Sequence, residues 1–240
     1  MEIFWRLLLG HLLADFTFQT DFINRWKRES FKGLLVHCLM HPAFYIALCW
    51  PFLGATWVDF PMLALRLNGW ACIAVVFFTH LLEDWWRIFA IARYRMPDNT
   101  AFFLWDQAIH YSVLIAVAPM AAASADVAGF VPEKWSVLGC LFILATHACT
   151  VMVYFVEKDA RGAEYPGFDE KYLAMSERLV LALCLVLPSA AGAAVLAAGW
   201  FGVMAFLRRA RLFELTAVSF YGGAAIAVLC GVAARVVYYG

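Results

Sequence analysis

The chain has 240 residues and a formal net charge of zero, and 65% of its residues are hydrophobic while only 15% are charged. Soluble domains average about 25% charged residues, so this composition excludes an ordinary soluble domain and indicates a polytopic membrane protein. The zero net charge gives no support to a nucleic-acid partner.

Apolar stretches of about 20 residues, the length that crosses a bilayer, predict the membrane spans. Glu2, His11 and Asp15 are atypical of a cleaved signal peptide, so the first span is expected to be retained. A basic amphipathic segment, Thr20–Lys32, connects the first two spans. The first five predicted spans are Ile3–Gln19, Gly33–Gly54, Trp70–Ala92, Ala101–Ala123 and Trp135–Glu157. Trp85, Trp86 and Arg87, near the end of the third span, are typical of an interfacial belt.

The segment from residue 170 to 207 leaves the number of spans open. One long kinked helix over Tyr172–Leu207 gives seven spans. A turn at Pro188–Gly192, between helices at about Glu170–Pro188 and Ala191–Leu207, gives eight.

The distribution of basic residues favours eight spans, because cytoplasmic connectors collect Lys and Arg. Only with eight spans do Arg208, Arg209 and Arg211 fall on the same side as the basic connectors after spans one, three and five. We therefore predict an all-α transmembrane helical bundle of about eight spans with both termini outside. Residues 1–240 are expected to form a single integral membrane domain.

Four of the predicted spans each carry two ionisable residues four positions apart, a spacing that places both side chains on one face of a helix. At about 1.5 Å of rise per residue, all of these residues fall in the cytoplasmic half of their spans. The pairs are His11 and Asp15, His37 and His41, His80 and Asp84, and Asp106 and His110. We expect residues 1–123 to form a four-helix metal-site half and residues 124–240 to form a supporting half.

The eight paired residues supply five imidazoles and three carboxylates, a set that suits zinc first, with iron or manganese as alternatives. Eight ligands exceed one tetrahedral site, so one or two divalent ions are expected. A single His–Asp pair is more often a packing contact than a ligand pair, but four pairs at one depth favour a metal site. Ligand-orienting roles are expected for Gln19, Thr20, Asp21 and Gln107.

Other candidate residues are weaker. His147 has no partner four residues away, and we expect it to be a core histidine or a group behind the ligands. The seven cysteines lie within apolar runs without a C-x-x-C pair, so we interpret them as buried hydrophobes. Glu177 and Arg178 lie within the membrane on the eight-span interpretation, where ionised pairs are functional by default; on the seven-span interpretation they begin a helix.

The motif His-Leu-Leu-Ala-Asp-Phe-x-x-Gln-Thr-Asp at 11–21, followed by His-x-x-x-His at 37–41, His-x-x-x-Asp at 80–84 and Asp-Gln-x-x-His at 106–110, resembles an uncharacterised family. That family comprises bacterial polytopic membrane proteins classed as a domain of unknown function. The stretches Glu177–Leu179 and Arg211–Glu214 are similar to its weaker C-terminal half. The pattern is also distantly similar to predicted membrane-bound metal-dependent hydrolases. The resemblance implies the bacterial inner membrane as location but no established activity.

The leading hypothesis is a metal-dependent intramembrane hydrolase that acts on a lipid or amphiphilic substrate from the cytoplasmic leaflet. A bound divalent metal lowers the pKa of water from 15.7 toward about 7. Glu177 is the candidate general base, and Arg178 is the candidate group that holds an anionic part of the substrate. The alternatives are a transition-metal transporter, a metal-dependent membrane oxidoreductase or hydroxylase, and a purely structural membrane subunit.

Overall fold

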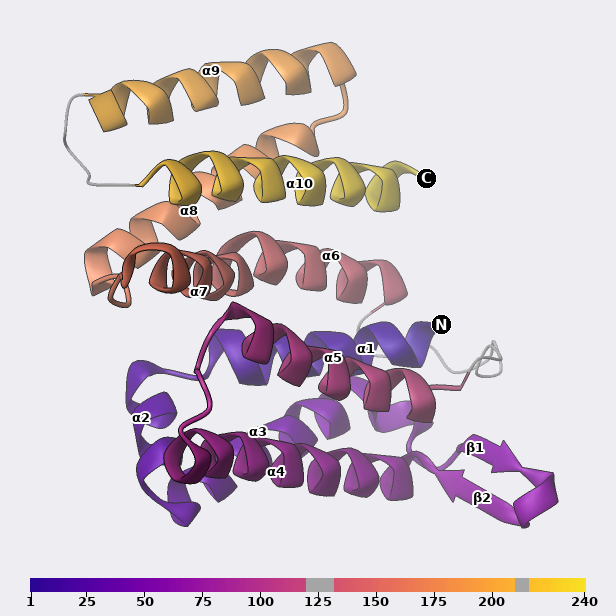
Figure 1. Ribbon diagram of the computed structural model, residues 1–240. Helices are drawn as coiled ribbons and strands as arrows, with labels where there is room; N and C mark the ends of the chain where they lie inside the picture. The colour runs from indigo at the N-terminus through magenta and orange to yellow at the C-terminus, as the bar shows by residue number, and fades with distance from the viewer. Residues whose placement is uncertain (120–131, 210–215) are drawn as a thin grey trace. The chain divides into compact units, whose positions relative to one another are not determined.

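The computed structural model describes residues 1–119, 132–209 and 216–240, and helices predominate in these ranges (Figure 1). The chain divides into two compact units, Met1–Ser136 (unit 1) and Val137–Gly240 (unit 2). The predicted all-α class is confirmed apart from one short hairpin. The predicted division at residue 123, most of the loop Ser124–Glu133 and the Arg211–Glu214 motif lie outside the described residues.

The described part of unit 1 is built on four helices that run side by side, with a short helix near one end and a β-hairpin at the other (Figure 1). The first helix continues from α-helical into π-helical geometry at Leu13. The four helices are α1 (Glu2–Leu12) with its π-helical extension η1 (Leu13–Thr17), α3 (Phe31–Cys49), α4 (Gly69–Tyr94) and α5 (Thr100–Val117).

The basic connector predicted between the first two spans forms the short helix α2 (Asp21–Glu29). Thr20 caps its start, because the threonine hydroxyl accepts a hydrogen bond from the Ile23 amide at 3.3 Å. The side chain of Ser30 caps α3 in the same way, 3.1 Å from the Gly33 amide. A Cβ at Gly33 would lie 2.4 Å from the carbonyl oxygen of Trp26, so glycine permits the close approach that folds α2 back against α3.

The loop expected between the second and third spans contains a two-stranded antiparallel hairpin, β1 (Thr56–Phe60) and β2 (Leu65–Asn68). Asp59 pairs with Arg66 across the hairpin, with Oδ2 and Nε 3.2 Å apart. The indole of Trp57 donates to the carbonyl oxygen of Phe52 at 2.9 Å, which fastens the hairpin to the end of α3.

The interior of unit 1 changes character along the helices. Near the hairpin it is apolar, and at the α2 end it holds the ionisable residues. Gly10 lies at the change, where an added Cβ would come within 2.8 Å of the Tyr45 ring, so α1 and α3 approach closely beside His11. The apolar end includes Ile3, Leu7, Tyr45, Phe52, Trp57, Ile73, Val76 and Leu114.

The boundary between the units falls within α6 (Glu133–Ile143), at Val137. From there the chain continues through the π-helical η4 (Leu144–Ala148) into α7 (Cys149–Arg161). Unit 2 then contains α8 (Phe168–Leu185), α9 (Ala190–Arg209), η5 (Val218–Gly222) and α10 (Gly223–Tyr239). α8 packs against both α9 and α10 around Leu181, Ala197 and Phe220. α8 ends at Leu185 and α9 begins at Ala190, so this segment forms two helices, as the two-helix interpretation predicts, and not one long helix.

The predicted count of about eight spans is not supported by the described helices. Five helical segments there are long and apolar enough to cross a membrane: Phe31–Phe52, Thr100–Val117, Glu133–Arg161, Ala190–Arg209 and Val218–Tyr239. α1, α4 and α8 are not among them. α1 has only 11 residues, and ionisable residues lower the hydropathy of the other two, at Glu83 and Asp84 in α4 and at Glu177 and Arg178 in α8.

Side-chain exposure supports a membrane protein. Phe78 and Leu82 on α4 are 64% and 63% exposed, and Leu229 on α10 is 70% exposed, while the histidines of unit 1 are buried. Apolar side chains outside and ionisable side chains inside reverse the usual arrangement of a soluble bundle. In lipid, this arrangement is the favourable one.

Candidate metal centre

All eight predicted ligands meet inside unit 1, where they form what we call the His/Asp cluster. Each of the four main helical segments contributes two of them, and every side chain is between 0% and 8% exposed. The matched depth inferred from helical rise is therefore present in three dimensions. The cluster consists of His11, Asp15, His37, His41, His80, Asp84, Asp106 and His110.

Asp15 is the centre of the contacts on one side of the cluster. Its Oδ1 lies 3.1 Å from Nε2 of His41 and 3.2 Å from Nε2 of His37. Its Oδ2 lies 3.3 Å from Nε2 of His11. Nε2 of His80 lies 3.8 Å from Oδ1, so four imidazoles point the same ring nitrogen at one buried carboxylate.

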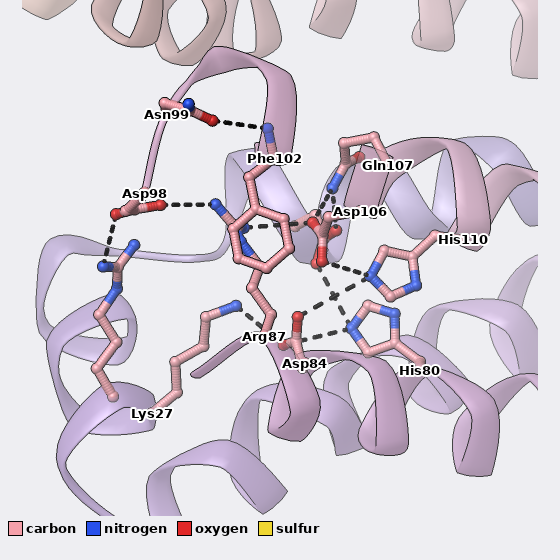
Figure 2. A network of polar contacts seen from close by, with 12 residues as sticks. Lys27, His80, Asp84, Arg87, Asp98, Asn99, Phe102, Asp106, Gln107 and His110 are labelled. Carbon is pink, nitrogen blue, oxygen red and sulfur yellow. Dashed lines mark hydrogen bonds and ion pairs between the residues drawn. The ribbon is translucent and has the colours of Figure 1, made fainter. Parts of the chain in front are cut away.

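Asp84 is the centre of the contacts on the other side of the cluster. Its Oδ2 lies 3.2 Å from Nε2 of His37 and 3.8 Å from Nε2 of His80, and its Oδ1 lies 3.9 Å from Nε2 of His110. His110 also approaches Oδ1 of Asp106 at 3.5 Å, as Figure 2 shows. The rings of His80 and His110 are stacked, with centroids 4.1 Å apart.

Many of these polar atoms have no hydrogen bond. Within the described residues, the buried atoms that make no hydrogen bond include Nε2 of His11, His37, His80 and His110, Oδ1 of Asp106, and Nδ1 of His37 and His41, although the Nε2 atoms lie within 3.2–3.9 Å of carboxylate oxygens. Buried polar atoms are almost always satisfied, and an acidic residue at the centre of a membrane helix costs about 2.5–3.5 kcal/mol. A cation between the converging imidazole nitrogens and carboxylates would give the nitrogens a partner and would offset the negative charge of the carboxylates.

The atoms divide into two ligand groups whose members lie within 4.8 Å of one another. The first group, site A, is Asp15, His37, His41 and His80. The second, site B, is Asp84, Asp106 and His110. Site A offers three nitrogens and one oxygen, a four-ligand set that suits tetrahedral zinc, whereas site B offers three ligands. His11 belongs to neither group and lies against Asp15.

A third group joins Cys38 to His80 and Asp84. From the sequence, Cys38 is expected to be only a buried hydrophobe, whereas in the structure its sulfur lies within 4.8 Å of ligand atoms of His80 and Asp84. No C-x-x-C pattern marks this cysteine, because its neighbours come from other helices.

The backbone at Asp15 is itself unusual. Asp15 lies in η1, and π-helical segments within α-helices occur frequently at functional sites. The contact between His11 and Asp15 is made across this segment, which ends at Thr17.

Gln107 has the ligand-orienting position that was expected. Its side-chain amide donates to Oδ2 of Asp15 at 3.4 Å and to Oδ2 of Asp106 at 3.2 Å, so one residue links sites A and B. Thr20 instead caps α2. Asp21 begins that helix as an exposed residue, and Gln19 has a buried Oε1 without a hydrogen bond among the described residues.

Three further charged residues, Lys27, Arg87 and Asp98, extend the cluster toward α2. The sequence does not predict them as site residues. Lys27 Nζ lies 3.0 Å from Oδ2 of Asp84. Arg87, which was predicted to lie in the interfacial belt, turns inward, with one guanidinium nitrogen 3.3 Å from Oδ2 of Asp106 and another 3.0 Å from Oδ1 of Asp98 (Figure 2). Arg87 follows His80 and Asp84 at positions i+7 and i+3, so its helical face was a usable signal.

The other predicted site residues lie in unit 2. Arg178 is 3% exposed and donates to the carbonyl oxygen of Ala174, the sulfur of Cys149 and the hydroxyl of Thr150. Glu177 is 4% exposed, and its carbonyl oxygen accepts a hydrogen bond from the indole of Trp200. His147 lies in η4, with Nδ1 3.2 Å from the hydroxyl of Thr146.

Comparison with known proteins gives one match. A family model described as a protein of unknown function (DUF3307) matches residues 3–138, which include every member of the His/Asp cluster. No curated protein and no solved structure matches this chain.

Proposed function

This chain belongs to the protein family of unknown function DUF3307, and we propose that it is a metal-dependent hydrolase within the membrane. The substrate is a lipid or another amphiphile that enters from the cytoplasmic leaflet. The observation that carries the proposal is the convergence of unsatisfied imidazole Nε2 atoms on three buried carboxylates in unit 1.

Two divalent ions fit this set of donors better than one. Site A and site B share no residue, and Gln107 donates to a carboxylate of each. Zinc is the first choice for the nitrogen-rich site A, while the more oxygen-rich site B also suits manganese or iron. Site A, with four protein ligands, has a supporting role, and site B, with three, retains a position for substrate or water.

A divalent metal in such a site supplies a strong Lewis acid and makes hydroxide available at neutral pH. The residues of the chain exclude water and orient the ligands. The cluster's burial excludes bulk water, Gln107 orients Asp15 and Asp106, and Arg87 donates to the same Oδ2 of Asp106 as Gln107 does. Such outer contacts fix ligand geometry, and their loss commonly lowers metal affinity about 10–100-fold.

The sequence-based assignments of Glu177 as general base and of Arg178 as an anion-binding group stay predictions, because both residues lie in unit 2 and the His/Asp cluster lies in unit 1. A second candidate base is Glu83, next to Asp84, whose buried Oε1 has no hydrogen bond in the part of the chain that the structure describes. Exchange of either glutamate for glutamine removes a proton acceptor while it retains the shape of the side chain.

We place the protein in a bacterial inner membrane with about eight crossings, in which α1, α4 and α8 also lie at membrane depth. Among the polar residues of α1 and α4, His11, His80 and Asp84 are buried inside unit 1. Polar groups within the membrane that face the bundle interior are compatible with insertion.

The test is hydrolysis by full-length protein purified in detergent without chelators, using lipid esters, amides and phosphates as substrates. Turnover of one class should depend on added zinc, manganese or iron and should be lost in Asp106→Asn. If no class is hydrolysed by protein that holds metal, the hydrolase assignment is wrong.

A further inference from the structure

A small pocket opens beside the His/Asp cluster between α2 and α4. Lys27 and Arg28 line it from α2, and Asp84, Arg87, Ile88 and Ile91 line it from α4. We call it the α2 pocket. Its volume is about 120 Å³, several times the roughly 30 Å³ that one water molecule takes up in the liquid. Since Asp84 lines the pocket and belongs to site B, the pocket borders the three-ligand site.

The charged lining of this pocket is mostly positive. Lys27 pairs with Asp84, Arg28 pairs with Oδ2 of Asp98 at 3.0 Å, and Arg87 bridges Asp98 and Asp106. Figure 2 shows Lys27 directed at Asp84, and Arg87 between Asp98 and Asp106. Two of the three acidic partners, Asp84 and Asp106, are members of site B.

Metal binding would change the balance of charge around the pocket. With site B loaded, Asp84 and Asp106 would share their charge with the ion. Lys27 would then lose compensation from Asp84, and Arg87 would lose compensation from Asp106 while it keeps its ion pair with Asp98. Both side chains are deep in the protein, at 11% and 12% exposure. A compact anion that enters the pocket would restore compensation for both cations and contact the metal at the same time.

The shape of the lining selects among anions. Arg87 offers a planar fork and Lys27 a point charge, the combination that suits phosphate oxygens. Ile88 and Ile91 form an apolar wall on the same side of α4, next to exposed apolar residues such as Trp85. A phosphate group attached to an apolar chain matches both the charged lining and the apolar wall of the pocket.

We propose that the α2 pocket binds the phosphate monoester group of the substrate when site B holds metal. The inference rests on the proposed function and deepens it, because it names the substrate's charged group. It assigns Lys27, Arg28 and Arg87 to substrate binding.

The first experiment uses full-length protein loaded with Mn²⁺, whose content is measured by elemental analysis, and inorganic phosphate as the probe. Bound phosphate near Mn²⁺ should show saturable broadening of its ³¹P resonance. Lys27→Met should weaken phosphate binding at least about tenfold, the loss expected for one charge-assisted hydrogen bond, without loss of manganese. Arg28→Met is a second variant, and it should weaken binding in the same direction.

Arg25→Met is the matched control, because Arg25 lies exposed on the same helix and does not line the pocket. It removes the same charge and should change phosphate affinity less than twofold. Equal phosphate affinity in wild type, Lys27→Met and Arg28→Met, with manganese bound in each, would overturn the pocket assignment and leave the metal site intact. Failure to take up manganese, zinc or iron would overturn the proposed function itself.

A second arm identifies the source of the phosphate group. Nanodiscs that contain phosphatidic acid should displace inorganic phosphate if the ligand is a lipid headgroup, while phosphatidylcholine nanodiscs should not. Displacement by a soluble alkyl phosphate, with no effect of phosphatidic acid, would assign the pocket to a soluble phosphomonoester. Displacement by neither compound would overturn the inference.

Discussion

The ammonium group of Lys27 lies 3.0 Å from Oδ2 of Asp84, so a residue from the short helix α2 reaches a carboxylate of the candidate metal centre. Lys27 and a metal ion at site B therefore compete for one oxygen. Its removal should strengthen metal binding at site B while it weakens phosphate binding in the α2 pocket.

The first prediction follows from this competition. Lys27→Met should lower the dissociation constant of the metal at site B by roughly tenfold, because one charge-assisted contact to Asp84 no longer has to be broken. Metal titration of chelator-stripped protein measures the change. An unchanged dissociation constant would show that the contact with Lys27 does not oppose metal binding.

The second prediction separates the two metal sites. Asp15→Asn removes the carboxylate of site A, and Asp106→Asn removes one carboxylate of site B. If wild type holds two equivalents, each variant should lose about one, and the double variant should lose both. Elemental analysis measures the content. Complete loss of metal in both single variants would favour one shared site over two.

The third prediction concerns the general base. Glu177→Gln should retain the metal while turnover falls by about 10²–10⁴-fold, the usual effect of general-base loss. Glu83→Gln is the comparison variant, since Glu83 is the second candidate base and the exchange is the same. If Glu83→Gln causes the larger loss, the base is Glu83; if Glu177→Gln removes metal, Glu177 is a ligand.

The fourth prediction concerns topology. With about eight crossings and both termini outside, a reporter fused after Gly240 should be periplasmic, as should one inserted between residues 124 and 133. A reporter inserted after Arg161 should be cytoplasmic. A cytoplasmic C-terminus would contradict the proposed topology.

The residues of the centre could be predicted because they are encoded locally. Four residues of separation place His80 and Asp84 on one face of a helix in any fold, and matched depth then predicts that the four helices bring their pairs together. The same reasoning extends to Gln107, which lies beside Asp106 and reaches both carboxylates.

Features that depend on contacts between distant segments could not be predicted in this way. The contact of Lys27 with Asp84 joins residues 57 positions apart and depends on the fold of α2 against α3. The hairpin has the tip Pro61–Leu63 instead of an Asn-Gly or Asp-Gly turn, so its strands carry no strong local signal. The ionisable residues of α4 mark the centre and also lower the mean hydropathy of that helix.

The most direct test of the account is metal content in three matched proteins purified without chelators. Wild type should hold one to two equivalents of zinc, iron or manganese. His37→Ala should lose most of it, because His37 Nε2 lies 3.2 Å from both Asp15 and Asp84. His147→Ala, in unit 2, should lose much less. No metal in wild type, or equal losses in the two variants, would contradict a metal centre built from the His/Asp cluster.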